Sequence, residues 1–174
     1  MRTAVLGRDV KRTFLRAILW AVVCIIGFKV SVVHVRVLGI SMLPTYPEKS
    51  THWVGRLAYV WHEPRRGDII AIRCNPEDSR NPVIASLKAP PQALLLKRVV
   101  GLPGETVSFS GGHLLIDGVP VEEPYETLPC DWTRSPEKLA ADQYFVVGDN
   151  RNMPQENHYF GRCARSQIVG KVLL

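Results

Sequence analysis

The sequence predicts a mainly β domain, built as antiparallel sheets or a partly open barrel, that follows one N-terminal transmembrane helix. An uncharged apolar run, residues 17–28, stands near the N-terminus behind a cluster of cations. Short runs rich in valine, isoleucine and leucine recur through the rest of the chain between turn residues. The 13 glycines and 13 prolines allow many turns, and no long helical periodicity follows the apolar run.

The transmembrane helix is predicted over residues 14–33, a length that spans a hydrocarbon core of about 30 Å. Arg16 and Lys29 fall near its ends, where long side chains reach the interface. A cleaved signal peptide has the same order of charge and apolarity, but no clear small-x-small site follows. A buried core helix would rarely be preceded by so many cations. We therefore expect a basic cytoplasmic segment, 1–13, then the anchor, and a β domain, 34–174, on the other side of the membrane, outside the cytoplasm.

Strands are predicted in the apolar runs 32–38, 68–73, 94–100, 106–110, 113–116, 144–147 and 168–174. Gly111-Gly112 between two of these runs indicates a hairpin, and Asp117-Gly118 is a favoured tight-turn pair. Segments 76–93 and 121–141 show no such pattern and are predicted to be exposed insertions or loops.

The charge distribution argues against a nucleic-acid partner. The 174 residues, 46% hydrophobic and 22% charged, are typical of a folded domain with a core. Most of the net charge of +6 lies in residues 1–16, which hold five basic side chains and one aspartate. The nearly neutral remainder offers little to a phosphate backbone, which clustered Lys and Arg bind.

The four cysteines, Cys24, Cys74, Cys130 and Cys163, include no C-x-x-C pair, so a zinc ribbon is not expected. Cys24 falls in the anchor, which leaves at most one disulfide for the β domain. Separate buried thiols are the preferred interpretation, and the redox compartment stays open.

Ser41 and Lys97 are candidate catalytic residues because of their positions in the predicted strands and turns. Ser41 follows the first predicted strand directly, beside a proline turn and close to the membrane exit. Lys97 and Arg98 interrupt the apolar run 94–100 and alternate between its faces, so one of them should meet apolar surroundings. Burial lowers the pKa of a lysine, and a neutral amine can act as general base for a serine. Each residue alone also has a structural explanation, as a strand-end serine or as a lysine at a sheet edge.

Four segments together resemble a known family. SMLPT (41–45), RGDII (66–70), KRVVGLPGETV (97–107) and GDNR (148–151) occur in the order and context of the type I signal peptidases. GDNR alone would indicate only a β-turn with a capping aspartate. The resemblance runs from the anchor to the C-terminus and implies a signal-peptidase-like β fold.

The resemblance implies a membrane-bound serine endopeptidase that removes N-terminal signal peptides from exported preproteins. Ser41 is the implied nucleophile and Lys97 the implied general base, with no metal and no cofactor. The expected partners are preprotein signal peptides and the lipid bilayer, and the oligomeric state stays open. Cleavage after small residues, in an Ala-x-Ala-like pattern, implies shallow apolar pockets, for which Met42, Leu95 and Leu96 are the candidates.

Other motif residues are expected to support the site. Gly39 stands where some family members carry a hydroxyl that assists the oxyanion hole, so the backbone N–H of Ser41 is its expected member here. Asp149, Asn150 and Arg151 form the last motif.

The segment after this motif departs from the family pattern. Pro154 replaces a serine that helps to orient the lysine in the family, while Glu156 and His158 stand for an aspartate and an arginine. Because of this difference, an alternative remains that the chain is a non-catalytic, membrane-anchored family member that binds preproteins or a partner subunit. A mitochondrial inner-membrane protease subunit is a second alternative, although GDNR is closer to the bacterial pattern. Self-cleaving repressors with a Ser–Lys dyad carry a DNA-binding domain and no anchor, which excludes them.

Overall fold

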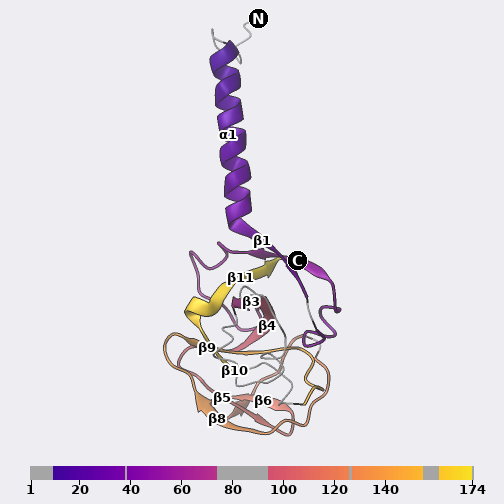
Figure 1. Ribbon diagram of the computed structural model, residues 1–174. Coiled ribbons are helices and arrows are strands. Elements are labelled where there is room, and N and C mark those ends of the chain that lie inside the picture. The colour runs from indigo at the N-terminus through magenta and orange to yellow at the C-terminus, as the bar shows by residue number, and fades with distance from the viewer. Residues whose placement is uncertain (1–9, 38, 74–93, 126, 155–160, 174) are drawn as a thin grey trace, which may run out of the picture.

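The computed structural model describes residues 10–37, 39–73, 94–125, 127–154 and 161–173. One long helix stands on a β domain, as Figure 1 shows. Within the described ranges, the strands form two antiparallel sheets. This arrangement confirms the predicted class, a mainly antiparallel β domain after one N-terminal apolar helix.

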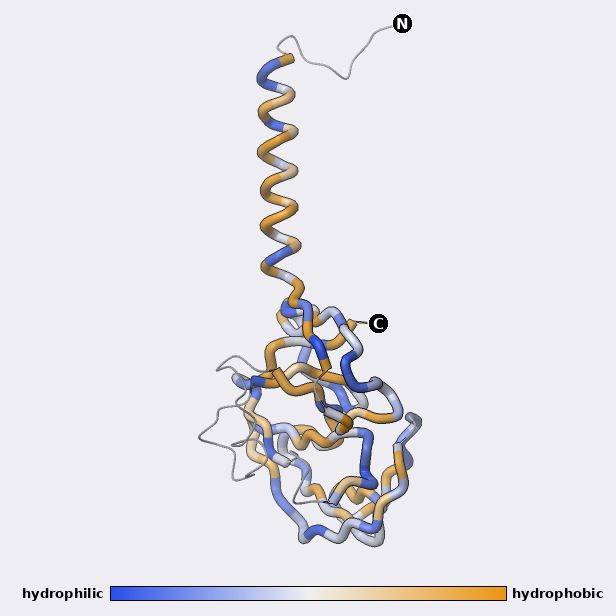
Figure 2. Tube along the Cα trace, turned by 45° about the vertical axis from the view of Figure 1, so that its right-hand side comes forward, coloured by the Kyte–Doolittle hydropathy of each residue, from blue (hydrophilic) through white to orange (hydrophobic). Residues whose placement is uncertain are grey.

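Helix α1 covers Val10–Ser31 and is long and apolar enough to cross a membrane. None of its residues is buried against the β domain. Figure 2 shows apolar residues along most of its length and hydrophilic residues towards its two ends. Strand β1 begins at Val32, so the chain passes from helix to sheet without a loop. The helix begins and ends somewhat earlier in the chain than the predicted range 14–33.

The larger sheet has seven strands in the order β1-β2-β11-β3-β4-β9-β10, and each neighbouring pair is antiparallel. Their bounds are Val32–Arg36 (β1), Thr51–Gly55 (β2), Ile69–Arg73 (β3), Leu94–Gly101 (β4), Gln143–Val147 (β9), Gly161–Ala164 (β10) and Ile168–Leu173 (β11). The C-terminal strand β11 lies between β2 and β3, so the end of the chain completes the centre of the sheet. A 3₁₀ turn, Arg165–Gln167, leads into it.

The smaller sheet has four strands in the order β7-β6-β5-β8. Their bounds are Thr106–Ser110 (β5), His113–Ile116 (β6), Val119–Pro120 (β7) and Arg134–Lys138 (β8). β5 and β6 form the predicted hairpin, closed by Gly111-Gly112. Asp117 and Gly118, both with positive φ (50° and 81°), make the tight turn from β6 to β7.

The prediction that 121–141 forms an exposed loop is wrong for part of this segment. It contains β8, which lies at the edge of the smaller sheet and, among the described strands, pairs with β5 alone. Most β8 side chains are therefore exposed and polar, so the strand lacks the apolar alternation that sequence analysis detects. Trp132 and Leu139, from the same segment, are only 3% and 2% exposed. Segment 76–93 lies outside the described residues.

Three apolar clusters form the interior, and β4 contributes to all of them. One cluster joins the two sheets and includes Val100 and Phe145. The Met42 cluster consists of Val35, Val37, Met42, Tyr46, Val54, Ala71, Leu96 and Val172. The Tyr59 cluster consists of Tyr59, Ile70, Ile72, Val99, Tyr144, Val146, Cys163 and Ile168. Alternate β4 side chains thus enter different clusters, which surrounds the centre of this strand with apolar groups.

Candidate active site

Ser41 and Lys97, 56 residues apart in the chain, meet in the structure. The Nζ atom of Lys97 donates to the Oγ atom of Ser41 over 2.8 Å. Ser41 lies in the turn that follows β1, and this turn is held by the bonds Leu43 N–H to Ile40 O and Tyr46 N–H to Met42 O. Ser41 is half-buried, whereas Lys97 is 2% exposed. A hydroxyl open to a substrate is therefore paired with an amine kept away from water.

Lys97 owes its burial to its place in the middle of β4. Its register partner on β3, Ile70, is fully buried. Leu95 packs at the rim of the Tyr59 cluster and Val99 inside it, while Leu96 belongs to the Met42 cluster, as strand alternation predicts. An ammonium group in such surroundings is costly, because water cannot solvate it.

Asn150 connects the GDNR turn to the serine turn. Its backbone N–H donates to the carbonyl oxygen of Ser41 over 3.0 Å, and its Nδ2 donates to the carbonyl oxygen of Ile40 over 3.0 Å. Asn150 is 4% exposed, and its Oδ1 atom has no hydrogen-bond partner among the described residues. These two bonds make Asn150 a positioning residue for the backbone at Ser41.

Arg98, the neighbour of Lys97, makes a buried ion pair with Asp149. Its Nε and Nη2 atoms donate to the two carboxylate oxygens over 2.8 Å and 2.6 Å. Its Nη1 atom donates to the carbonyl oxygen of Gly67 over 2.8 Å, and the Thr45 hydroxyl also donates to Asp149. Burial alone would lower the pKa of Arg98, but the bonds to Asp149 outweigh it and hold this pKa above its ordinary value. The pair therefore joins β4, the serine turn and the GDNR turn.

A second group of side chains continues this network from segment 121–141. The ring of Tyr125 lies under the Arg98 guanidinium, 3.8 Å from its Cζ atom. The Tyr125 hydroxyl donates to Glu123 over 2.6 Å, and Arg151 bonds the same carboxylate over 2.8 Å. Burial, reinforced by the nearby Glu123 carboxylate, raises the pKa of Tyr125, so it stays protonated at neutral pH. Sequence reasoning missed Glu123 and Tyr125, because no local pattern marks either residue.

The other predicted site residues lie around this centre. Gly39 has a φ of +90°, and a side chain at this position would meet nothing within 4 Å. Met42 and Leu96 are 1% and 5% exposed and lie together in the Met42 cluster. Leu95 packs against the Tyr59 cluster instead, so the three candidates for the substrate pockets are divided between two clusters.

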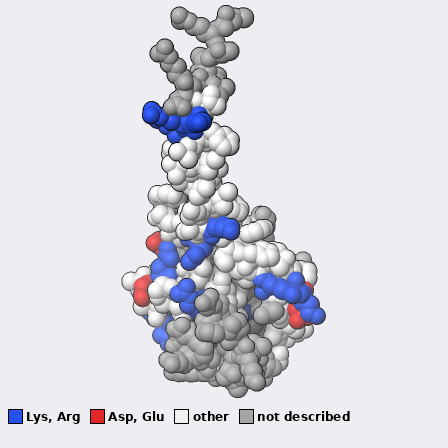
Figure 3. All heavy atoms as spheres, turned by 45° about the horizontal axis from the view of Figure 1, so that its top comes forward, with Lys and Arg blue, Asp and Glu red and all other residues white. Residues whose placement is uncertain are grey.

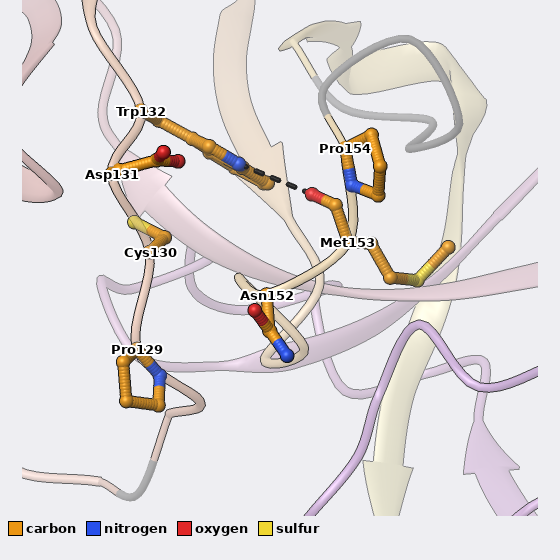
Figure 4. Close-up of a pocket in the computed structure, with 7 residues that line it drawn as sticks. All are labelled: Pro129, Cys130, Asp131, Trp132, Asn152, Met153 and Pro154. Carbon is orange, nitrogen blue, oxygen red and sulfur yellow. Dashed lines mark hydrogen bonds between the residues drawn. The ribbon is translucent and has the colours of Figure 1, made fainter.

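The chain beyond Arg151 borders a cavity of about 560 Å³, drawn in Figure 4. Pro129 to Trp132 form one side of it, and Asn152 to Pro154 form the other. The indole Nε1 of Trp132 donates to the carbonyl oxygen of Met153 over 3.1 Å. Pro154, which replaces the family serine, is exposed and offers no hydroxyl. Glu156 and His158 lie outside the described residues.

The described cysteines are free thiols: Cys24 is exposed on α1, Cys130 is half-buried and Cys163 is buried. Burial raises the pKa of Cys163 to about 12, so this thiol stays protonated and packs as an apolar group. Cys74 lies outside the described residues. In the part of the chain that the structure describes, no three His, Cys, Asp or Glu side chains are grouped to hold a metal ion.

Comparison with known proteins places the chain in a family. The family described as "Signal peptidase, peptidase S26" matches residues 10–174. Signal peptidase I of Leptolyngbya laminosa is 38% identical over 155 residues, which are 88% of this chain and 73% of the relative. The probable signal peptidase I-2 of Synechocystis sp. is 32% identical over 156 residues, 88% of this chain and 67% of the relative.

The chain is also similar to a more distant relative and to a solved structure. Signal peptidase I V of Bacillus subtilis is 29% identical over 151 residues, 79% of this chain and 81% of the relative. The crystal structure of a signal peptidase I from Enterococcus faecalis V583 aligns with a TM-score of 0.43 and 29% identity, covering 64% of this chain and 97% of that one. The resemblance deduced from the four sequence segments is thus confirmed, and the chain belongs to the signal peptidase (peptidase S26) family as a homologue of signal peptidase I.

Proposed function

We propose that this chain is a membrane-bound serine endopeptidase that removes N-terminal signal peptides from exported preproteins with a Ser41–Lys97 dyad. The observation that carries the proposal is the 2.8 Å contact between the Ser41 hydroxyl and an amine that is 2% exposed. Membership of the family supports signal peptides as the substrates. A non-catalytic, binding-only member would have no need to keep these two side chains in contact.

In the proposed mechanism, the unprotonated amine of Lys97 takes the proton of the Ser41 hydroxyl. The Oγ atom attacks the scissile carbonyl carbon, and the resulting tetrahedral intermediate collapses. Lys97 returns the proton to the leaving amine, which departs as the N-terminus of the mature protein. Lys97 then takes a proton from a water molecule as its oxygen attacks the acyl carbon. The bond to Oγ breaks, Lys97 returns the proton to Ser41, and the signal peptide leaves with a free carboxylate. Burial of Lys97 favours the neutral form that both steps require.

The proposed oxyanion hole includes the backbone N–H of Ser41. Among the described residues, no acceptor engages this group. Gly39 contributes no hydroxyl, and one donor of this kind is worth about 3–4 kcal/mol in the transition state. A water molecule or another donor must therefore supply the second hydrogen bond.

An extended substrate can add a strand beside Lys97. Pairing between β4 and β9 begins at Arg98, so the described part of the sheet leaves the backbone of 94–97 unpaired on that side. A bound peptide would pair with this edge through main-chain hydrogen bonds. We assign the preference for small residues, in an Ala-x-Ala-like pattern, to shallow pockets beside Met42, Leu95 and Leu96.

Helix α1 is the proposed membrane anchor, with its N-terminus in the cytoplasm. Lys11, Arg12 and Arg16 lie in its first half, where cytoplasmic cations are expected. The β domain would then stand on the outer face of the inner membrane. Ser41 follows the end of the helix by one strand and part of a turn, so it would act near the bilayer surface.

The test uses the purified full chain in detergent with a preprotein substrate. We expect the parent to remove the signal peptide, and Ser41→Ala and Lys97→Ala to lose at least about 10³-fold in kcat. Arg162→Gln, a change of an exposed residue on β10, serves as the control and should keep full activity. Cleavage that survives in either dyad variant excludes the dyad. A parent that binds the preprotein without cutting it supports the binding-only alternative.

A further inference from the structure

A second cavity lies at the base of helix α1, away from the GDNR turn. It has a volume of about 430 Å³ and is lined by Val33, Arg56, Arg73, Leu94 and Val169. These residues belong to β1, β3, β4 and β11 or directly follow β2, so the cavity crosses one side of the larger sheet. Val33, Leu94 and Val169 are also the partly buried rim of the Met42 cluster. The cavity therefore has an aliphatic floor that continues into the core.

The charged side chains among the described lining residues are both basic. Arg56 and Arg73 are exposed, and none of the described residues that line the cavity is acidic. Within the described ranges, neither guanidinium is bonded to a carboxylate. Figure 3 shows Lys and Arg side chains gathered where the helix meets the β domain. Two unpaired guanidiniums beside an aliphatic floor suit a ligand with an anionic head and an apolar tail.

The cavity also lies at the level of the helix end. The backbone N–H of Arg56 donates to the carbonyl oxygen of Ser31, the last residue of α1, over 2.8 Å. Val33 follows the helix by two residues. If α1 spans the bilayer, Arg56 and Val33 stand at the depth of the lipid headgroups. Because the cavity adjoins the end of the anchor helix, a membrane lipid is the ligand that we expect in it.

We propose that this cavity binds one anionic phospholipid of the leaflet that faces the β domain. Its phosphodiester would bond the guanidiniums of Arg56 and Arg73, and part of an acyl chain would cover Val33, Leu94 and Val169. Leu94 is three residues before Lys97 on β4, about 10 Å along the strand, so the lipid would dock the domain beside the reactive centre. The proposal rests on the membrane placement of α1 and is independent of the Ser41–Lys97 chemistry.

Native mass spectrometry of the detergent-solubilised full chain tests this site. The chain is mixed with equal amounts of phosphatidylglycerol and phosphatidylcholine, and the lipid that it retains is counted. We expect one phosphatidylglycerol to be preferred, and each of Arg56→Gln and Arg73→Gln to lower its retention about fivefold. Val169→Trp, which fills the cavity without changing charge, should lower it as well. Equal retention of both lipids by the parent would overturn the proposal.

Matched controls separate this site from other sources of binding. Arg36→Gln removes an exposed guanidinium of β1 that does not line the cavity, and it should leave retention unchanged. A loss in Arg36→Gln as large as in Arg56→Gln would show a diffuse charge effect and refute the site. Displacement of phosphatidylglycerol by millimolar glycerol phosphate would identify a free-phosphate site instead. Displacement by a signal-peptide segment would assign the cavity to the preprotein.

Separate measurements test the membrane placement of the chain and the independence of lipid binding from catalysis. Extraction of the full chain from vesicles by carbonate would reject the membrane placement, whatever lipid is retained. Ser41→Ala should retain phosphatidylglycerol like the parent, because this change does not touch the cavity. Thermal unfolding of each variant establishes that it is folded, so a loss of lipid can be assigned to the missing contact.

Discussion

The backbone N–H of Asn150 donates to the carbonyl oxygen of Ser41 over 3.0 Å, so the turn after β9 holds the turn after β1. The side chain adds a bond from Nδ2 to Ile40 O, also over 3.0 Å. Together they set the backbone direction at the proposed nucleophile. The contact involves no reacting atom, which assigns Asn150 a positioning role.

Asn150→Ala should therefore lower kcat about tenfold while KM changes little, because the side-chain bond to Ile40 is lost but the substrate edge is untouched. Asn150→Asp keeps the size of the side chain but removes the Nδ2 donor, so it should lower kcat to a similar extent. Steady-state cleavage of a preprotein measures both constants, with Asn152→Ala as an exposed neighbouring control. A change in KM alone would contradict the positioning role.

Removing one partner of the buried Arg98–Asp149 pair should be costly. Asp149→Ala leaves the Arg98 guanidinium buried without its carboxylate, which typically lowers the free energy of unfolding by about 3–5 kcal/mol. Glu137→Gln breaks ion pairs at more exposed sites and should cost about 0–1 kcal/mol. Denaturant unfolding in detergent compares the two variants. Equal losses would show that the buried pair contributes no more than a surface pair.

Gly101 allows the two sheets to approach closely. A Cβ atom at this position would lie 2.5 Å from Val107 Cγ2 and 2.8 Å from Phe145 Cβ. Gly101→Ala should therefore destabilise the β domain by about 1–3 kcal/mol, since the core must shift to accept the methyl group. Gly27→Ala, in helix α1 with nothing within 4 Å, is the control. The midpoint of thermal unfolding should fall only for Gly101→Ala.

Asp68 should make stability depend on acid pH. Burial alone would raise its pKa, but hydrogen bonds from Lys171, the Arg65 backbone and Tyr59 outweigh it, so the pKa lies below its ordinary value of 3.8. A carboxyl with a depressed pKa contributes stability above its unfolded pKa and loses it as the pH falls through the folded pKa.

The unfolding midpoint should thus fall as the pH drops below about 4, and Asp68→Asn should flatten this dependence while lowering stability at neutral pH. Asp131→Asn, at an exposed aspartate, should leave the pH profile unchanged. A parent-like acid slope in Asp68→Asn would assign the effect to other carboxylates.

Several features could be deduced from local patterns alone. The apolar run predicted the helix, valine-rich and leucine-rich runs predicted β1, β3, β4, β9 and β11, and the Gly-Gly and Asp-Gly pairs predicted the turns around β6. Residue type also directed attention to Ser41 and Lys97, because an ammonium inside an apolar strand is anomalous wherever the strand lies. These properties depend on neighbours in the chain, so they can be predicted before the fold is known.

Contacts between distant segments depend on how the whole chain packs. Alternation required one of Lys97 and Arg98 to meet apolar groups, but packing buried both, one against Ser41 and the other against Asp149. No local sequence pattern indicates the polar edge strand β8 or the Tyr125 ring under Arg98. The pairing of an edge strand and the stacking of a ring depend on residues far away in the chain. A hydrogen bond across 56 residues depends on sheet pairing and turn geometry together, which no window of sequence contains.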